Sequence, residues 1–152
     1  MKKLILGWLC VLSMFTFSAP AQARGQGTGA EAEAMVKKAV ALIKANGKDK
    51  ALADFNNPKS AYVDRDLYIF VIDKDGTTLA NAANAKLVGK NVMEMKDVNQ
   101  VYFVKKFFET VKDKGKGWVD YTWSNSTTQA MEKKSTYVET IDGLIVGCGI
   151  YK

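Results

Sequence analysis

The sequence contains no histidine, and it has only two cysteines. Histidine is the commonest general base in enzymes and the commonest metal ligand, so its absence removes the usual basis for both kinds of chemistry. Cys148 stands between two glycines in an apolar segment, where we expect a small buried thiol rather than a nucleophile. There is also no glycine-rich phosphate loop, nucleophile elbow or metal-ligand spacing. These absences predict a protein that is not an enzyme and uses no cofactor, although two carboxylates or a Ser–Lys pair meeting in space would remain an alternative.

Only one long apolar run occurs, and it lies at the start of the chain. Met1–Lys3 is positively charged, Leu4–Ser18 carries no charge, and small residues then end in an Ala-x-Ala pattern at Ala23. A membrane-spanning helix needs about 20 apolar residues, more than this run supplies. Cys10 follows the bulky Leu9, which argues against a lipid anchor. The pattern predicts a signal peptide over residues 1–23, cleaved near Ala23, and a periplasmic or secreted protein.

The remaining chain has the length of one domain. Cleavage would remove Lys2 and Lys3, so the net charge of +6 would fall by two to +4. This charge is spread along the chain, which gives no reason to expect a nucleic-acid partner. Residues 24–29 are rich in glycine and predict a disordered leader, followed by a single domain over residues 30–152.

Helical spacing appears in three places. Thr28 and Glu31 fit a capping box, and apolar residues at helical spacing then predict a helix to about Ala45. A second, shorter helix is expected over residues 49–55, ahead of Pro58. Asp97 is expected to cap a third helix, which places Val101, Val104, Phe108 and Val111 on one face and ends at Gly115 and Gly117.

Five segments have the pattern of strands. The run 66–73 is apolar on both faces, and a turn at 73–76 leads into a returning strand over 77–81. Residues 82–96 are irregular and long for a loop, a feature often linked to function. Three further strands are expected over 118–124, 134–141 and 144–151, with Asp142-Gly143 as the hairpin turn between the last two. The sum is an α+β fold: a PAS-like, five-stranded antiparallel sheet with a long N-terminal helix and a crossing helix.

Aromatic residues are concentrated on these strands. Alternation places Tyr121 and Trp123 on one face of their strand, and Tyr68 and Phe70 share a face of another. From spacing alone, such aromatics are more often ordinary core than a ligand site. Lys134 and Tyr137 lie three residues apart, so they point to opposite sides of a regular strand and converge only if a bulge or the strand start intervenes.

Several motifs in the same order resemble a single Cache domain. They are Asp66-Leu67-Tyr68-Ile69-Phe70-Val71, Leu87-Val88-Gly89-Lys90-Asn91, Gly117-Trp118-Val119-Asp120-Tyr121-x-Trp123, Lys134-Ser135-x-Tyr137-Val138 and Gly143-Leu144-x-Val146-Gly147-x-Gly149-Ile150-Tyr151. The resemblance extends from about Met35 to the end of the chain. Two prolines that are frequent in the family, after the Tyr-x-Trp motif and before the lysine, are absent here. This departure leaves open whether Lys133 or Lys134 faces the pocket.

The resemblance implies an extracytoplasmic sensor domain that binds a small organic acid between the sheet and the loops on its distal face. Carried over by position, the ligand-binding residues would be Tyr68, Phe70, Tyr102, Tyr121, Trp123, Lys134 and Tyr137, with Tyr102 the weakest of them. No signalling domain follows in this sequence, so we expect a stand-alone binding protein. Its partner would be a membrane receptor or kinase in signal transduction such as chemotaxis, with a homodimer through the N-terminal helix as a further expectation. The alternative is a ligand-free periplasmic module for protein interaction or dimerisation.

Overall fold

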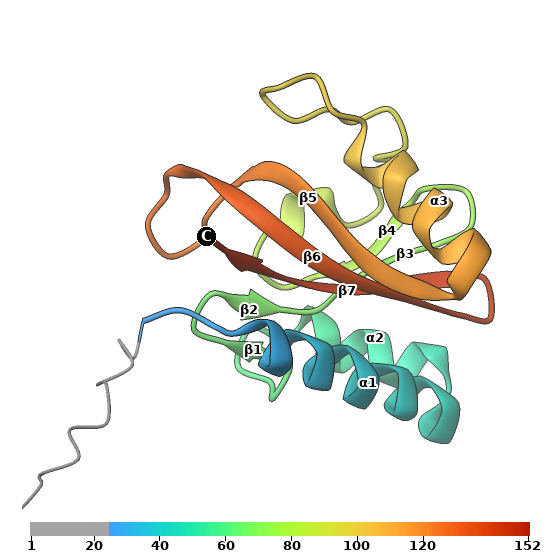
Figure 1. Ribbon diagram of the computed structural model, residues 1–152. Helices are drawn as coiled ribbons and strands as arrows, with labels where there is room; N and C mark the ends of the chain where they lie inside the picture. Colours follow the sequence, from blue (N-terminus) through green and yellow to red (C-terminus); the bar gives the residue numbers. More distant parts are fainter. Residues whose placement is uncertain (1–24) are drawn as a thin grey trace, which may run out of the picture.

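The computed structural model describes residues 25–152, so the expected signal peptide and its cleavage site lie outside the described residues. A five-stranded antiparallel sheet in the order β4-β3-β7-β6-β5 lies between two helical layers (Figure 1). Helices α1 and α2 cover one face, and α3 with the long loop before it covers the other. The elements are α1 (Gly29–Asn46), α2 (Lys48–Asn56), β1 (Val63–Asp64), β2 (Leu67–Tyr68), β3 (Phe70–Ile72), β4 (Thr78–Asn81), η1 (Ala85–Leu87), α3 (Phe103–Lys114), β5 (Lys116–Ser124), β6 (Met131–Ile141) and β7 (Leu144–Tyr151). The expected α+β class and five-stranded sheet are confirmed.

The first helix begins where the sequence predicts. The Thr28 hydroxyl accepts the Glu31 N–H, and the Glu31 carboxylate accepts the Thr28 N–H at 2.7 Å, which completes the capping box. Val36, Ala39 and Ile43 are buried against the sheet. Burial of this apolar face, rather than helix propensity alone, stabilises a helix of this length.

Residues 25–28, which belong to the leader expected over residues 24–29, contact the fold just before α1 begins at Gly29. The Gly27 N–H donates to the buried Asp66 carboxylate at 2.6 Å. The Arg65 guanidinium donates to the Gln26 carbonyl at 3.0 Å and to the Glu31 carboxylate at 2.8 Å. A buried carboxylate needs donors, and here the leader backbone supplies one of them.

The apolar run 66–73 forms two short strands instead of one. The break falls at Ile69, whose N–H donates to the Tyr62 carbonyl at 3.0 Å. As a result β2 pairs with β1, whereas β3 pairs with β4 and β7. The side-chain alternation survives the break, so Tyr68 and Phe70 both face the α3 layer while Leu67 and Ile69 face α1.

The third helix starts five residues later than the sequence suggests, because Asp97 caps a loop and not the helix, whose N-cap is Tyr102. Its carboxylate accepts the N–H groups of Asn99 at 2.8 Å and Val101 at 2.9 Å, and that of Thr122 in β5 at 2.9 Å. The loop is thereby tied to the edge strand. With the helix starting at Phe103, its buried face consists of Phe103, Val104, Phe107 and Val111, and Phe108 lies only at the margin.

Across residues 25–152, no helix has both the length and the apolar character needed to cross a membrane.

Candidate functional site

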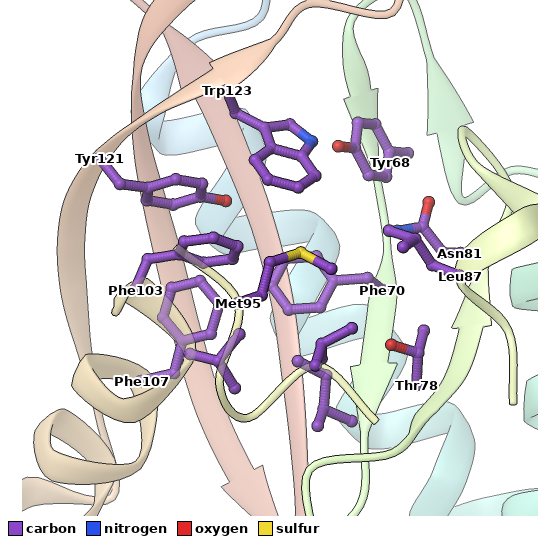
Figure 2. A pocket seen from close by; sticks show the side chains of 13 residues that line it. Tyr68, Phe70, Thr78, Asn81, Leu87, Met95, Phe103, Phe107, Tyr121 and Trp123 are labelled. Atoms are coloured by element: carbon purple, nitrogen blue, oxygen red, sulfur yellow. The ribbon is translucent and has the colours of Figure 1, made fainter. Parts of the chain in front are cut away.

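A small cavity lies between the sheet and the α3 layer. It has a volume of about 40 Å³. Figure 2 shows Tyr68 and Trp123 at one end, Tyr121, Phe103 and Phe107 on one flank, and Asn81 and Thr78 on the other. The complete lining is Tyr68, Phe70, Ile72, Thr78, Asn81, Leu87, Val92, Met95, Phe103, Val104, Phe107, Tyr121 and Trp123. Because a cavity needs roughly 10–15 Å³ to hold one water, this one accommodates only a few non-hydrogen atoms unless its walls move.

Aromatic rings form the flank of the cavity on which Tyr121, Phe103 and Phe107 lie (Figure 2). The rings of Phe103 and Tyr121 stack with centroids 4.4 Å apart, and Trp123 meets Phe103 edge-on at 5.1 Å. Phe107 packs on Phe70 at 5.6 Å. These ring contacts line the flank of the cavity with apolar surface.

Two glycines on β7 make room for the site. A Cβ on Gly147 would lie 2.3 Å from the Phe70 ring, and a Cβ on Gly149 would lie 2.3 Å from Lys134 Cε. Both side chains therefore lie flat across β7, one over each glycine. Any larger residue at these positions would push Phe70 or Lys134 out of place.

Lys134 is the most unusual group near the cavity. It is 1% exposed, and its ammonium donates to the Tyr68 hydroxyl at 2.8 Å and to the Tyr151 hydroxyl at 3.1 Å. The nitrogen also lies 4.3 Å from the centre of the Tyr68 ring and 4.6 Å from that of Tyr151. Among residues 25–152, no carboxylate lies within salt-bridge distance of it. Burial accordingly lowers the pKa of Lys134, since desolvation disfavours the charged form.

The neighbouring tyrosines stay neutral hydrogen-bonding groups. Burial raises the pKa of Tyr68 and of Tyr121 to about 12. The Tyr121 hydroxyl shares a hydrogen bond of 3.0 Å with the Thr136 hydroxyl, and the Tyr151 hydroxyl donates to the Ser124 carbonyl at 2.8 Å. Since the Tyr68 oxygen accepts from Lys134, the Tyr68 proton can be donated to an acceptor in the cavity.

Five of the seven candidate residues from the sequence come together here. Tyr68, Phe70, Tyr121 and Trp123 line the cavity, and Lys134 contacts the Tyr68 hydroxyl. Between the two lysines left open by the sequence, Lys134 is buried on this side and Lys133 is exposed.

Tyr137 and Tyr102 are placed elsewhere. Strand β6 pairs without a bulge on both sides, so Tyr137 faces α1 and packs on Trp118 with ring centroids 5.5 Å apart. Tyr137 is therefore not in the pocket where it was expected, because residues 134 and 137 of a regular strand lie on opposite faces. Tyr102 lies outside the cavity, with its ring between the ammonium groups of Lys96 at 4.6 Å and Lys105 at 4.4 Å.

Sequence reasoning missed much of the lining. Phe103 and Phe107 come from α3, whose expected buried face included Phe108 and neither of these two residues. Thr78 and Asn81 carry no distinctive pattern within their strand. Tyr151 was visible only as the last residue of a family motif, and nothing in the sequence indicated its contact with Lys134.

The Cys148 thiol is not activated. Cys148 is buried as expected, with its Sγ 3.9 Å from the Met35 sulfur, and burial raises the pKa of this thiol to about 12. Within the described part of the chain, no three His, Cys, Asp or Glu side chains gather as a metal site would require.

A family model and several solved structures match this chain. The family model described as Single Cache domain 2 matches residues 10–152. A methyl-accepting chemotaxis protein from Vibrio parahaemolyticus is 26% identical with a TM-score of 0.69, over 80% of this chain and 86% of that one.

Two further solved structures share the fold. The periplasmic sensor domain of a chemotaxis protein is 22% identical with a TM-score of 0.62, over 80% of this chain and 88% of its own. A Cache chemosensory domain whose structure concerns carboxylic acid recognition is 23% identical with a TM-score of 0.63, over 80% of this chain and 86% of that one.

Proposed function

Because the chain belongs to the single Cache domain 2 family, we propose that it is a periplasmic sensor-type protein that binds a short organic carboxylate. The observation that carries this proposal is the buried ammonium of Lys134, which has two phenol hydroxyls as partners and no carboxylate among residues 25–152. A buried charge without a counter-charge is costly, and an anionic ligand would relieve that cost.

The proposed binding mode uses Lys134 and Tyr68 together. The carboxylate of the ligand accepts the free proton of the Tyr68 hydroxyl, whose oxygen already accepts from Lys134 at 2.8 Å. The same carboxylate reaches the third ammonium proton of Lys134 after a small shift of the Tyr68 ring. Each hydrogen bond to a charged group contributes about 1.5–3 kcal/mol net. Two such contacts contribute about 3–6 kcal/mol, so micromolar binding, which needs about 8 kcal/mol, also requires burial of the alkyl part of the ligand.

The size of the cavity limits the ligand to a few non-hydrogen atoms. Its volume of about 40 Å³ suits an acid of two or three carbons, with the alkyl part against Phe70 and Phe107. Each buried methylene contributes about 0.8 kcal/mol. The cavity also favours a binding protein over a ligand-free interaction module, in which the same aromatic rings would pack without a gap.

The proposal extends to where the protein is located and to the partner it acts on. We propose that residues 1–23 are a signal peptide that directs the domain to the periplasm, where similar sensor domains are found. There the protein would report its ligand to a membrane receptor or kinase in signal transduction such as chemotaxis. Its role would be binding and not catalysis.

The test is a calorimetric titration of the secreted protein with acetate, propionate, lactate and pyruvate, supported by thermal shifts. We expect one of these acids to bind at micromolar concentration and Lys134→Met to weaken it at least tenfold. Lys133→Met is the matched control and should bind normally, because Lys133 is exposed. Full affinity in Lys134→Met would refute the role of this lysine. A folded protein that binds no carboxylate would favour the interaction module instead.

A further inference from the structure

Asp66 is a buried carboxylate without an ion-pair partner. It is 1% exposed and lies in the turn between β1 and β2, two residues before Tyr68. No lysine or arginine of residues 25–152 forms an ion pair with it. The neighbouring Arg65 pairs instead with Asp64 at 2.7 Å and with Glu31 at 2.8 Å. Buried charges in proteins are normally paired, so a carboxylate left alone at this place calls for an explanation.

The two oxygens of the Asp66 carboxylate differ in their surroundings. Oδ1 accepts the Gly27 N–H at 2.6 Å, and the carbonyl of the same peptide bond, on Gln26, accepts from Arg65 at 3.0 Å. Oδ2 has no hydrogen-bond partner, and it is the single buried side-chain oxygen or nitrogen of residues 25–152 in that condition. The leader backbone therefore fixes the carboxylate, while no local donor compensates the charge on its second oxygen.

Lys134 is the matching case of opposite charge, a buried ammonium without a carboxylate partner. Its side chain crosses β7 over Gly149, and β2, which begins directly after Asp66, lies against β7. The ammonium ends on the Tyr68 hydroxyl at 2.8 Å. Because two residues of chain separate Asp66 from Tyr68, their α-carbons are at most about 7 Å apart. Two buried and unpaired charges of opposite sign thus lie at the same end of the sheet.

The other titratable groups around Lys134 are uncharged near neutral pH. They are the phenols of Tyr68 in β2, Tyr121 in β5 and Tyr151 in β7, and the Cys148 thiol in β7. Burial raises the pKa of Tyr68, Tyr121 and Cys148 to about 12, and it raises that of Tyr151 as well. The face of α3 toward the sheet is apolar. Burial lowers the pKa of Lys134, and the negative charge of Asp66 opposes that effect.

We propose that Asp66 is the buried counter-charge of Lys134 and therefore a positioning residue of the carboxylate site, which acts through Lys134 and does not touch the ligand. The effect on binding rests on the proposed function, whereas the effect on Lys134 itself does not. Opposite charges several ångströms apart in a protein interior attract without contact, and this attraction favours the ammonium over the neutral amine. Asp66 leaves the place of a ligand carboxylate open, because it is not within ion-pair distance of the ammonium. Since Asp66 also repels an anion, its loss should not weaken binding near neutral pH.

The experiment replaces Asp66 with asparagine, which has the same shape and keeps an oxygen for the Gly27 N–H but carries no charge. Asp64→Asn is the matched control, because Asp64 is exposed and pairs with Arg65. NMR of the full secreted protein with isotope-labelled lysine follows the titration of Lys134 without ligand, and Lys134→Met identifies its signal. Calorimetric titration with propionate, near neutral pH and above the midpoint of that titration, measures the effect on binding. Asp66→Ser, which also keeps an oxygen at this place, gives the same comparison if Asp66→Asn does not fold.

We expect the midpoint of the Lys134 titration to fall by about one pH unit in Asp66→Asn and to stay unchanged in Asp64→Asn. The pH at which propionate binding declines should fall by the same amount, with no loss of affinity near neutral pH. An unchanged Lys134 titration in Asp66→Asn, or an equal shift in Asp64→Asn, would overturn the inference. If the midpoint shifts as expected but no acid binds, the proposed function fails and the counter-charge stands. If the midpoint shifts while the pH dependence of propionate binding does not, the role of Asp66 in binding is refuted.

Discussion

Replacing Gly149 with alanine tests the site without touching any residue that contacts a ligand. The new Cβ would lie 2.3 Å from Lys134 Cε and 2.4 Å from Thr136 Oγ1, both far inside normal contact distance. The Lys134 side chain is flexible near its end, so it yields before the backbone does. Its nitrogen then leaves the Tyr68 and Tyr151 hydroxyls, which now lie at 2.8 and 3.1 Å.

The size of the effect follows from the contacts that are lost. A ligand carboxylate would lose at least one charge-assisted hydrogen bond, worth about 1.5–3 kcal/mol. Since each 1.4 kcal/mol is a factor of about ten, affinity should fall between about tenfold and a hundredfold. The fold itself should persist, because the displaced atoms belong to a side chain and β7 keeps its pairing with β6 and β3.

Calorimetric titration with the best carboxylate measures this loss, and circular dichroism checks the fold. Cys148→Ala is the matched control, because the adjacent thiol faces α1 and Met35 instead of the cavity. It should lower the melting temperature and leave affinity unchanged. If Gly149→Ala binds with full affinity, the position of Lys134 over this glycine has no role in binding, and the reasoning is refuted.

Three more outcomes are expected. Thr28→Ala removes the side-chain half of the capping box and should lower the free energy of unfolding by about 1 kcal/mol in a denaturant titration, whereas loss of the helix cap without a change in stability would contradict the assignment. Hydrogen bonds from the Thr28 N–H and from Arg65 lower the pKa of Glu31 from 4.5 to about 2. The ionised Glu31 therefore stabilises the fold above about pH 4.5, and this contribution is lost as the pH falls toward 2. Glu31→Gln should flatten this part of an acid-unfolding curve. Burial lowers the pKa of Lys134 below 10.5, so a carboxylate should bind well while Lys134 is protonated and more weakly as the pH rises through the lowered pKa of Lys134. This decline should come before Tyr68 ionises, since the pKa of Tyr68 is about 12. A Lys134→Arg protein that still binds should not show the decline.

The sequence alone determined the class of the fold and most of its elements. Helix α1 followed from a capping box and a helical stripe of apolar residues, which are both local signals. The turn at Asp142-Gly143 and the alternation of β5 likewise depend on neighbouring residues only. For Tyr137, alternation indicated the side of the strand opposite Lys134, but only the regular pairing of β6 in the structure excluded a bulge.

Only the tertiary structure decided how the site is put together. Asp97 bonds to Thr122, 25 residues away, so it holds the loop against β5 and the helix begins only at Phe103. Lys134 meets Tyr68 across 66 residues, and Gly149 leaves the room over β7 that the Lys134 side chain occupies. Local patterns specify which face of a strand a residue takes, but the distance between two side chains on different strands is fixed only when the sheet and its helices pack.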